Sequence, residues 1–341
     1  MIRLIVFAVF ITLVSPRAWC VDDWYTTGSA HLLNRVYSDS AYYSGLIGLG
    51  VSTNFDYLDK TSWTIGGNYN YKRYQTGLSS APSDMNEFIG FAGLAMNKYL
   101  DSYPGKITYR VDVYLGRDQY NGITMNSSGP GSMGGGSRQV SISDNFYVIS
   151  TLVSYLNNSK TFYLDLGLAL SSYQSDSTDL NIDIAHPNRN NLSTSSAADD
   201  IRVTQWTPTM GWGFHNAMDW VQVRPYFLRY SSSNRVAYRK SSAAVQLQWL
   251  HWFSYDALLG LNRVNLSLVG GQRIYAVDND SYSLYNTPDL QRTSLSLGAK
   301  WKLDEDSSID LHAGMETYLD LVDNEDYKSQ FVFVQLSQNW Q

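Results

Sequence analysis

The stretch FVFVQLSQNW, from Phe331 to Trp340, alternates between two kinds of residue and stops one position before the last residue printed. In an extended strand, residues at alternate positions point to the same side. One side carries the apolar set Val332, Val334, Leu336 and Trp340, and the other carries Phe333, Gln335, Ser337 and Asn339. The stretch is therefore predicted to be a β-strand with one apolar face and one mostly polar face.

The same period of two recurs through most of the chain. In one stretch, Leu164, Leu166 and Leu168 alternate with Asp165 and Gly167. Each candidate strand is long enough to cross a membrane at a tilt. The candidates are 24–37, 42–56, 62–75, 86–99, 106–120, 139–156, 160–174, 200–214, 219–232, 235–252, 263–277, 290–303, 308–322 and 328–340. The faces of 86–99 and 139–156 are ambiguous and stay unassigned.

Long and short predicted connections alternate along the chain. Long ones follow odd-numbered strands, at 76–85, 121–138, 175–199 and 278–289, whereas those after even-numbered strands are mostly short. A barrel with tight turns at one end and longer loops at the other shows this parity, and a soluble sandwich has no reason to. The chain is therefore predicted to be all-β, a transmembrane antiparallel up-and-down barrel of about 14 strands, within roughly 12 to 16.

The composition agrees with a wall that has one apolar and one polar face. Mean hydropathy is -0.27 and only 16% of residues are charged. Beyond the N-terminus, no run approaches the roughly 20 apolar residues that a spanning helix needs. Polar residues such as Asp165 would be costly against lipid and are inexpensive against a wet lumen.

The first twenty residues have the pattern of a secretory signal peptide. Arg3 precedes an apolar core from Leu4 to Val14, and Ala18 and Cys20 supply small residues for a cleavage site. Cleavage there would leave 21–341 as a single barrel domain without cysteine, and would change the net charge from -6 to -8 by removing Arg3 and Arg17. An acidic mature chain argues against nucleic acid as a partner.

Taken together, the signal peptide, the amphipathic strands, the loop parity and the aromatic Trp340 resemble the outer-membrane β-barrels of Gram-negative bacteria. The resemblance is architectural and covers the whole mature chain. It implies an outer-membrane location with both termini periplasmic, contact with membrane lipid and lipopolysaccharide, and assembly by the barrel insertion machinery. That machinery reads the last strand, so Val332, Val334, Leu336 and Trp340 are the expected assembly signal. Gln341 departs from the class, because the aromatic usually ends the chain.

A catalytic site is the less favoured interpretation. His312 and Asp310 share the inferred lumen face of one strand, and Ser296 and Lys300 would be diagonal neighbours across the next turn. The sequence around these residues has no motif of a barrel hydrolase, and Ser, His and Asp are also the ordinary filling of a wet wall. The chain is thus predicted to be neither an enzyme nor dependent on a metal or cofactor.

Charged residues on the inferred inner faces point to a pore. A basic wall is predicted on the later strands, opposed by acids that could either segregate across the lumen or pair locally. The basic set is Arg224, Lys240, Arg263, Arg273, Arg292, Lys300 and Lys302, and the acidic set is Asp112, Asp165, Asp310, Glu316 and Asp320. Inward aromatics that could narrow the pore or stack on sugar rings are Tyr163, Tyr226, Tyr275 and Tyr318.

The leading functional hypothesis is an outer-membrane channel for small hydrophilic solutes, with saccharides or anions as candidate solutes. The first alternative is an export or assembly barrel for a surface polysaccharide or protein. The second is a surface interaction barrel that acts through its long loops. Conductance would favour the channel, neighbouring genes for polymer synthesis the export barrel, and a closed lumen the surface barrel or an enzyme.

Overall fold

The structure is a computed structural model that describes residues 24–75, 83–101, 104–126, 137–175, 200–231, 234–254, 260–278, 283–284, 289–321 and 324–340. The expected signal peptide at 1–20 lies outside these residues. So do 127–136 of the connection at 121–138 and 176–199 of the connection at 175–199.

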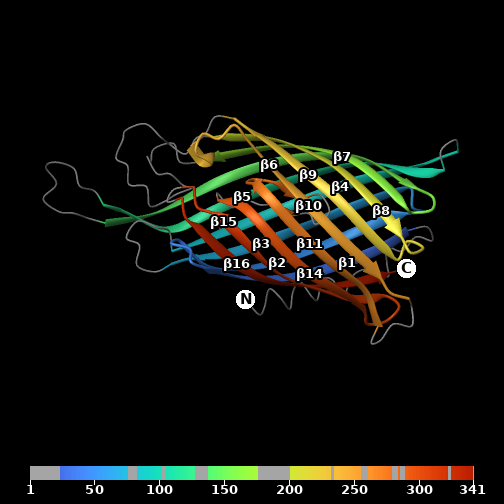
Figure 1. Ribbon diagram of the computed structural model, residues 1–341. Helices are drawn as coiled ribbons and strands as arrows, with labels where there is room; N and C mark the ends of the chain where they lie inside the picture. The colour runs from blue at the N-terminus through green and yellow to red at the C-terminus, as the bar shows by residue number, and fades with distance from the viewer. Residues whose placement is uncertain are drawn as a thin grey trace, which may run out of the picture.

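Fourteen antiparallel strands form one closed barrel (Figure 1). The wall strands are β1 (Trp24–Ser38), β2 (Tyr43–Tyr57), β3 (Thr61–Tyr74), β4 (Asp84–Leu100), β5 (Gly105–Asn126), β6 (Ser137–Asn157), β7 (Phe162–Ser175), β8 (Ile201–Phe214), β9 (Asp219–Tyr230), β10 (Ser241–Trp252), β11 (Leu261–Arg273), β14 (Leu290–Lys302), β15 (Ser307–Leu319) and β16 (Asp326–Trp340). Consecutive wall strands pair with each other, and β16 pairs with β1 to close the sheet. Closure removes the sheet edges, which would otherwise leave backbone groups unpaired. The predicted all-β up-and-down barrel of about 14 strands is confirmed.

The two ends of the barrel differ in their connections. One end, called the short-turn end here, carries the turns after β2, β6, β8 and β14 and also the outer ends of β1 and β16. The opposite end is called the long-loop end. In the turn after β14, Asp304 accepts backbone hydrogen bonds from Asp306 (2.9 Å) and Ser307 (2.6 Å). Hydrogen bonds from the Ser307 hydroxyl and from these two amides lower the pKa of Asp304.

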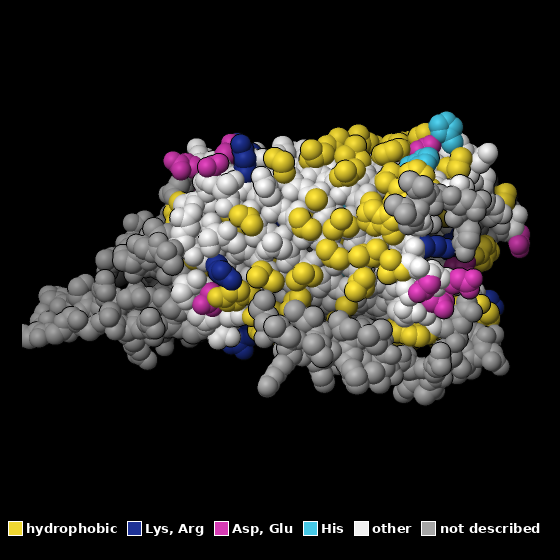
Figure 2. Space-filling view, turned by 90° about the horizontal axis from the view of Figure 1, so that it is seen from below, with side chains coloured by type: hydrophobic (Ala, Val, Ile, Leu, Met, Phe, Trp, Pro, Cys, Tyr) yellow, Lys and Arg dark blue, Asp and Glu magenta, His cyan; other side chains and the backbone are white. Residues whose placement is uncertain are grey.

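The outer surface is apolar around the middle of the wall. Leu166 and Leu168 of β7 point outward and are exposed. Asp165, which directly precedes Leu166, points inward and is buried. Figure 2 shows hydrophobic side chains over the central part of one face, with charged side chains gathered toward the two ends. Val332 and Leu336 of the last strand belong to the same outer surface. This arrangement matches a wall whose outer face contacts lipid.

Among the residues described, no helix is both long and apolar enough to cross a membrane.

Trp340 is placed by a glycine on the neighbouring strand. Its ring covers Gly28 of β1, where a side chain would collide with it. The backbone register sets Trp340 opposite Thr26, two residues from Gly28 and on the same face of β1. The last aromatic residue therefore packs across the seam that closes the barrel.

Inside the barrel, apolar and aromatic side chains fill the part nearer the long-loop end. One buried cluster includes Phe146 and Val148 of β6 and Ile89 and Phe91 of β4. These are the two strands whose faces the sequence left ambiguous, because apolar residues occupy their inner as well as their outer faces.

Two strands end earlier or begin later than predicted. The candidate 235–252 begins only at Ser241, because a short 3-10 helix, η1 (Asn234–Val236), precedes it. The candidate 263–277 ends at Arg273, since Gly271 and Tyr275 have positive φ angles of 118° and 54° and turn the chain into the lumen. A short hairpin, β12 (Val277–Asp278) and β13 (Ser283–Leu284), follows and is separate from the wall.

The ladder between β8 and β9 has a gap near its middle. The register pairs Trp206 with Phe227 and Met210 with Val223, but the positions between them are not paired. Pro208 and Pro225 would face each other in this register, and proline has no backbone N–H to donate. The β8–β9 ladder thus lacks pairing beside the polar network described below.

Candidate functional site: the lumen

A cavity of about 860 Å³ occupies the lumen on the side of the short-turn end. At that end it is lined by Thr27, Ser62 and Ala95, and at its inner limit by Tyr37 and Lys72. Small hydroxyl and amide side chains on the inner faces leave this space open. Its volume lies within the roughly 300–1,000 Å³ typical of ligand sites. Polar lining residues include Ser29, Asn54, Thr64, Asn68, Gln246, Gln248, Asn265, Ser267 and Gln335.

The predicted basic residues lie in different parts of the barrel. Three of them, Arg224, Arg263 and Arg273, line the cavity. Lys300 faces inward opposite Asp310 in the β14–β15 register, whereas Lys302 is exposed near the short-turn end.

Two residues of the predicted basic wall lie elsewhere. Lys240 is exposed in the connection before β10, because that strand begins one residue later. Arg292 falls in a register shift between Gln291 and Thr293, and it pairs with the half-exposed Asp326 at 2.7 Å. Neither residue is among those that line the cavity.

Acids and bases of the lumen pair locally and do not form opposing walls. The distances are 3.0 Å for Arg263–Asp310, 3.9 Å for Arg224–Asp165, 2.6 Å for Arg35–Glu316 and 2.9 Å for Arg110–Asp112. Asp320, the remaining predicted acid, is buried directly after β15, at the long-loop end.

Within these pairs the arginine is always the more exposed partner. Side-chain exposure is 27% for Arg263 against 15% for Asp310, and 17% for Arg110 against 1% for Asp112. It is 8% for Arg224 against 1% for Asp165, and 13% for Arg35 against 4% for Glu316. In the Arg224–Asp278 pair the exposures are nearly equal, 8% against 10%, and Glu87, Asp278 and Glu316 also line the cavity, so its surface presents both N–H donors and carboxylates.

A segment from Ile274 to Asp278, called the inner segment below, folds from the end of β11 into the lumen. Ile274, Tyr275, Ala276 and Val277 are almost fully buried. The side chain of Gln205 binds the backbone of Val277 in both directions, donating to its carbonyl (2.7 Å) and accepting from its amide (2.9 Å). This pair imitates one rung of a β-ladder and fixes the segment against β8.

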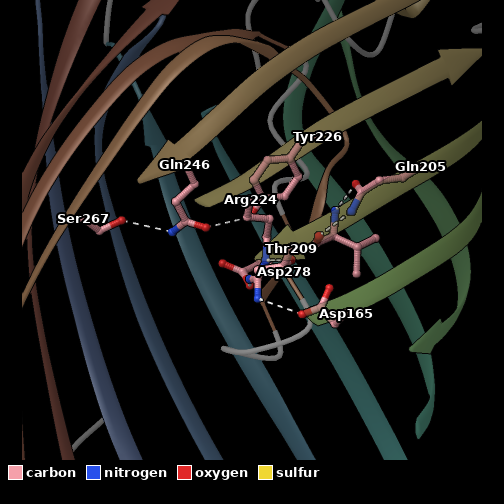
Figure 3. A network of polar contacts seen from close by, with 9 residues as sticks. Asp165, Gln205, Thr209, Arg224, Tyr226, Gln246, Ser267 and Asp278 are labelled. Atoms are coloured by element: carbon pink, nitrogen blue, oxygen red, sulfur yellow. Dashed lines mark hydrogen bonds and ion pairs between the residues drawn. The ribbon is translucent and has the colours of Figure 1, made fainter. Parts of the chain in front are cut away.

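Arg224 is the centre of the network that holds the inner segment (Figure 3). Its Nε donates to the Thr209 hydroxyl at 3.0 Å, and its guanidinium lies 3.5 Å from Asp278 and 3.9 Å from Asp165. The ring of Tyr275 packs on Tyr173 with 4.6 Å between centroids. Charge-assisted contacts of this kind are stronger than neutral ones when they are shielded from water.

A layer of tyrosines fills the rest of the long-loop end. Its members are Tyr37, Tyr43, Tyr74, Tyr120, Tyr318 and Tyr327, all buried. The ammonium of the buried Lys72 lies 3.8 Å from the ring centroid of Tyr43, a cation–π contact. The tyrosine layer and the inner segment together limit the cavity on this side.

The candidate catalytic set is only partly assembled. His312 Nε2 lies 2.8 Å from Asp310 Oδ1 on the cavity wall. Ser296 also lines the cavity, but among the described residues it has no hydrogen bond to His312. Asp310 is shared with Arg263 at 3.0 Å. Within the described residues, His312 contacts a carboxylate that Arg263 shares, and no hydrogen bond joins it to a serine, the contact by which a base activates a nucleophile.

The predicted aromatic track is dispersed. Tyr226, Tyr275 and Tyr318 are buried in the packed part of the lumen, and Tyr163 lies near the short-turn end against Trp220 at 6.2 Å. Metal binding has no candidate either: within the described ranges, no three His, Cys, Asp or Glu side chains are grouped to hold an ion.

Several cavity residues were missed by the sequence analysis. Arg35 and His31 share inward parity on β1, opposite the outward Leu32 and Val36, so the alternation rule could have found them. No comparable signal marked the inner segment, since Tyr275 and Val277 continue the alternation of the strand before them.

Comparisons with known proteins agree with this architecture. No family model matches the chain, and no curated protein matches it. Many solved structures match the chain, including the following three, which match over nearly the full length. The monoaromatic hydrocarbon channel CymD has a TM-score of 0.55 at 7% identity, with 94% of this chain and 90% of that chain covered.

The toluene transporter TodX of Pseudomonas putida has a TM-score of 0.52 at 12% identity, covering 96% and 93%. The toluene transporter TbuX of Ralstonia pickettii has 0.52 at 7% identity, covering 94% and 90%. At such identities the likeness establishes the fold. The closed wall, its apolar exterior and the likeness in fold define the class as that of Gram-negative outer-membrane β-barrels.

Proposed function

We propose that the protein is an outer-membrane channel for small hydrophilic, oxygen-rich solutes. In this proposal the apolar belt lies in the outer membrane, in contact with lipid and lipopolysaccharide. The short-turn end and both termini face the periplasm, as they do in barrels with this loop parity. Val332, Val334, Leu336 and Trp340 present the last strand to the insertion machinery.

The polar cavity is the observation that carries the proposal. It runs along the lumen from the short-turn end, and its wall combines amides, hydroxyls and arginines that are more exposed than their acids. Hydroxyl and carboxylate oxygens of a solute would find N–H and O–H donors on this wall. This supports saccharides and small organic anions as the solute class. Transport requires the inner segment or the tyrosine layer to move, since both limit the cavity at the long-loop end.

Planar-bilayer recording tests the proposal. The purified protein should give discrete conductance steps, and liposomes containing it should swell in isotonic sugar solutions. A folded, inserted barrel that neither conducts nor admits any sugar or organic anion would contradict it.

A hydrophobic solute is the second candidate. The similar solved structures are hydrocarbon channels by name, and the long-loop part of this lumen is lined by tyrosines and apolar side chains. Uptake of toluene by liposomes, together with exclusion of sugars, would favour this alternative.

A further inference from the structure

We infer that the wall formed by β1, β16 and β15 holds a saccharide-binding subsite centred on Phe333. The inference rests on the proposed function and deepens it, because it names the solute class and the residues that would select it. Phe333 lines the polar cavity and is partly exposed, unlike the buried tyrosines of the long-loop end.

Three rings lie side by side on neighbouring strands of this wall. Phe333 of β16 has His31 of β1 at 5.2 Å between ring centroids and His312 of β15 at 5.8 Å. A glycine makes room for each imidazole, since a Cβ on Gly50 would collide with His31 and one on Gly298 would collide with His312. The two histidines can therefore lie against the wall and leave Phe333 accessible between them.

The polar groups beside the rings suit hydroxyl groups. Asp310 accepts from Arg263 at 3.0 Å and lies 2.8 Å from His312, so the network is fixed in place. Two buried atoms near it, Arg263 Nε and Asn265 Oδ1, have no hydrogen-bond partner among the described residues. One is a donor and the other an acceptor, and a sugar hydroxyl can act as both. Leaving such atoms unpaired is costly, so a ligand that satisfies them is favoured.

This combination selects a pyranose ring over other solutes. The apolar C–H face of a sugar can cover Phe333 while its hydroxyls reach the polar groups at the ring edge. A hydrocarbon would cover the same ring but would remove water from the partly exposed side chains of Arg263 and Asp310 without replacing its hydrogen bonds, and would leave the buried Asn265 Oδ1 unpaired. A small inorganic anion would contact Arg263 but gain nothing from Phe333.

The test is calorimetric titration of the purified, detergent-folded barrel with maltose, cellobiose and sucrose. At least one should bind the natural protein, and Phe333→Ala should weaken that binding by about tenfold or more through loss of the ring contact. Phe333→Trp should retain it, and Asn265→Leu should weaken it without abolishing it. Phe227→Ala removes an outward-facing ring of the same kind and should change nothing.

The possible results separate the subsite from the channel. Equal affinity in the natural protein and Phe333→Ala would overturn the subsite, as would absence of binding by all three sugars or a preference for toluene over them. Conductance is recorded independently on the same preparations. A conducting barrel without sugar binding would remove the subsite alone, whereas a non-conducting barrel would remove the proposed channel.

Discussion

The two halves of this lumen are enclosed by the same strands yet differ in what fills them. Toward the short-turn end, inward hydroxyls, amides and ion pairs leave a cavity of about 860 Å³. Toward the long-loop end, aromatic side chains and the inner segment pack the lumen, and Tyr114 and Phe146 are completely buried. A closed wall of fourteen strands therefore does not by itself determine an open pore. The size of the inward side chains and the path of one connection decide it.

The largest expected difference between the halves is in stability. Phe146 is buried, lies over Gly116 and packs on Tyr173 at 5.6 Å, so Phe146→Ala should lower the free energy of unfolding by about 3–5 kcal/mol. Phe333→Ala should cost only about 1 kcal/mol, because its site already borders water. Urea unfolding in lipid vesicles measures both. Equal losses would show that the two halves are packed alike.

Releasing the inner segment should change conductance. The double variant Gln205→Ala, Asp278→Ala removes the amide pair to Val277 and the contact with Arg224. We expect a several-fold rise in mean bilayer current, since the segment would no longer be held in the lumen. Thr204→Ala, on the outward face beside Gln205, is the matched control. An unchanged current in the folded double variant would exclude the inner segment as the constriction.

The preference of the channel for anions or cations should change when charges in the cavity are substituted, and much less when a charge at the rim is. Arg263→Gln with Arg110→Gln leaves Asp310 and Asp112 without their arginine partners. Since acids then dominate this part of the wall, the reversal potential in a salt gradient should move toward cation preference. Lys302→Gln, at the exposed rim, should move it much less. Similar shifts for both variants would mean that the paired arginines do not set selectivity.

The smallest effect is expected at a turn outside both halves. Asp304→Ala should lower stability slightly at neutral pH, because it removes the hydrogen bonds from the backbone amides of Asp306 and Ser307. The folded-state pKa of Asp304 is lowered. Its contribution is therefore present above the ordinary aspartate pKa of about 4 and lost as the pH falls through the lowered value. A difference between variant and natural protein that persists at pH 2 would contradict this assignment.

Most of the fold could be predicted because the outer face follows a simple rule. Lipid requires apolar residues at every second position, and Leu164, Leu166 and Leu168 show that period whatever lies inside. The rule failed on β4 and β6, where Ile89 at the edge of the cavity and Phe146 in the packed lumen are apolar residues on the inner face and remove the contrast between faces. Strand ends were also mispredicted, so Lys240 was assigned to a strand that begins after it.

The candidate site was predicted less well because pairing depends on register between strands. Alternation placed Arg263 and Asp310 inward, but it could not show that they meet. The inner segment was missed because Tyr275 and Val277 keep the period of a strand. Their inward turn depends on Gln205 and Arg224, residues about 70 and 50 positions away in the chain, and such contacts leave no local pattern.

Cysteine accessibility tests the contrast between the two halves most directly. The expected mature chain lacks cysteine, so Ser296→Cys in the cavity and Ala244→Cys in the packed half each introduce a single thiol. A membrane-impermeant, water-soluble maleimide applied at the short-turn end should modify the cysteine at 296 rapidly and the cysteine at 244 at least tenfold more slowly, because only the thiolate that meets water reacts. Equal rates at the two positions in folded barrels would contradict the division of the lumen into an open polar half and a packed half.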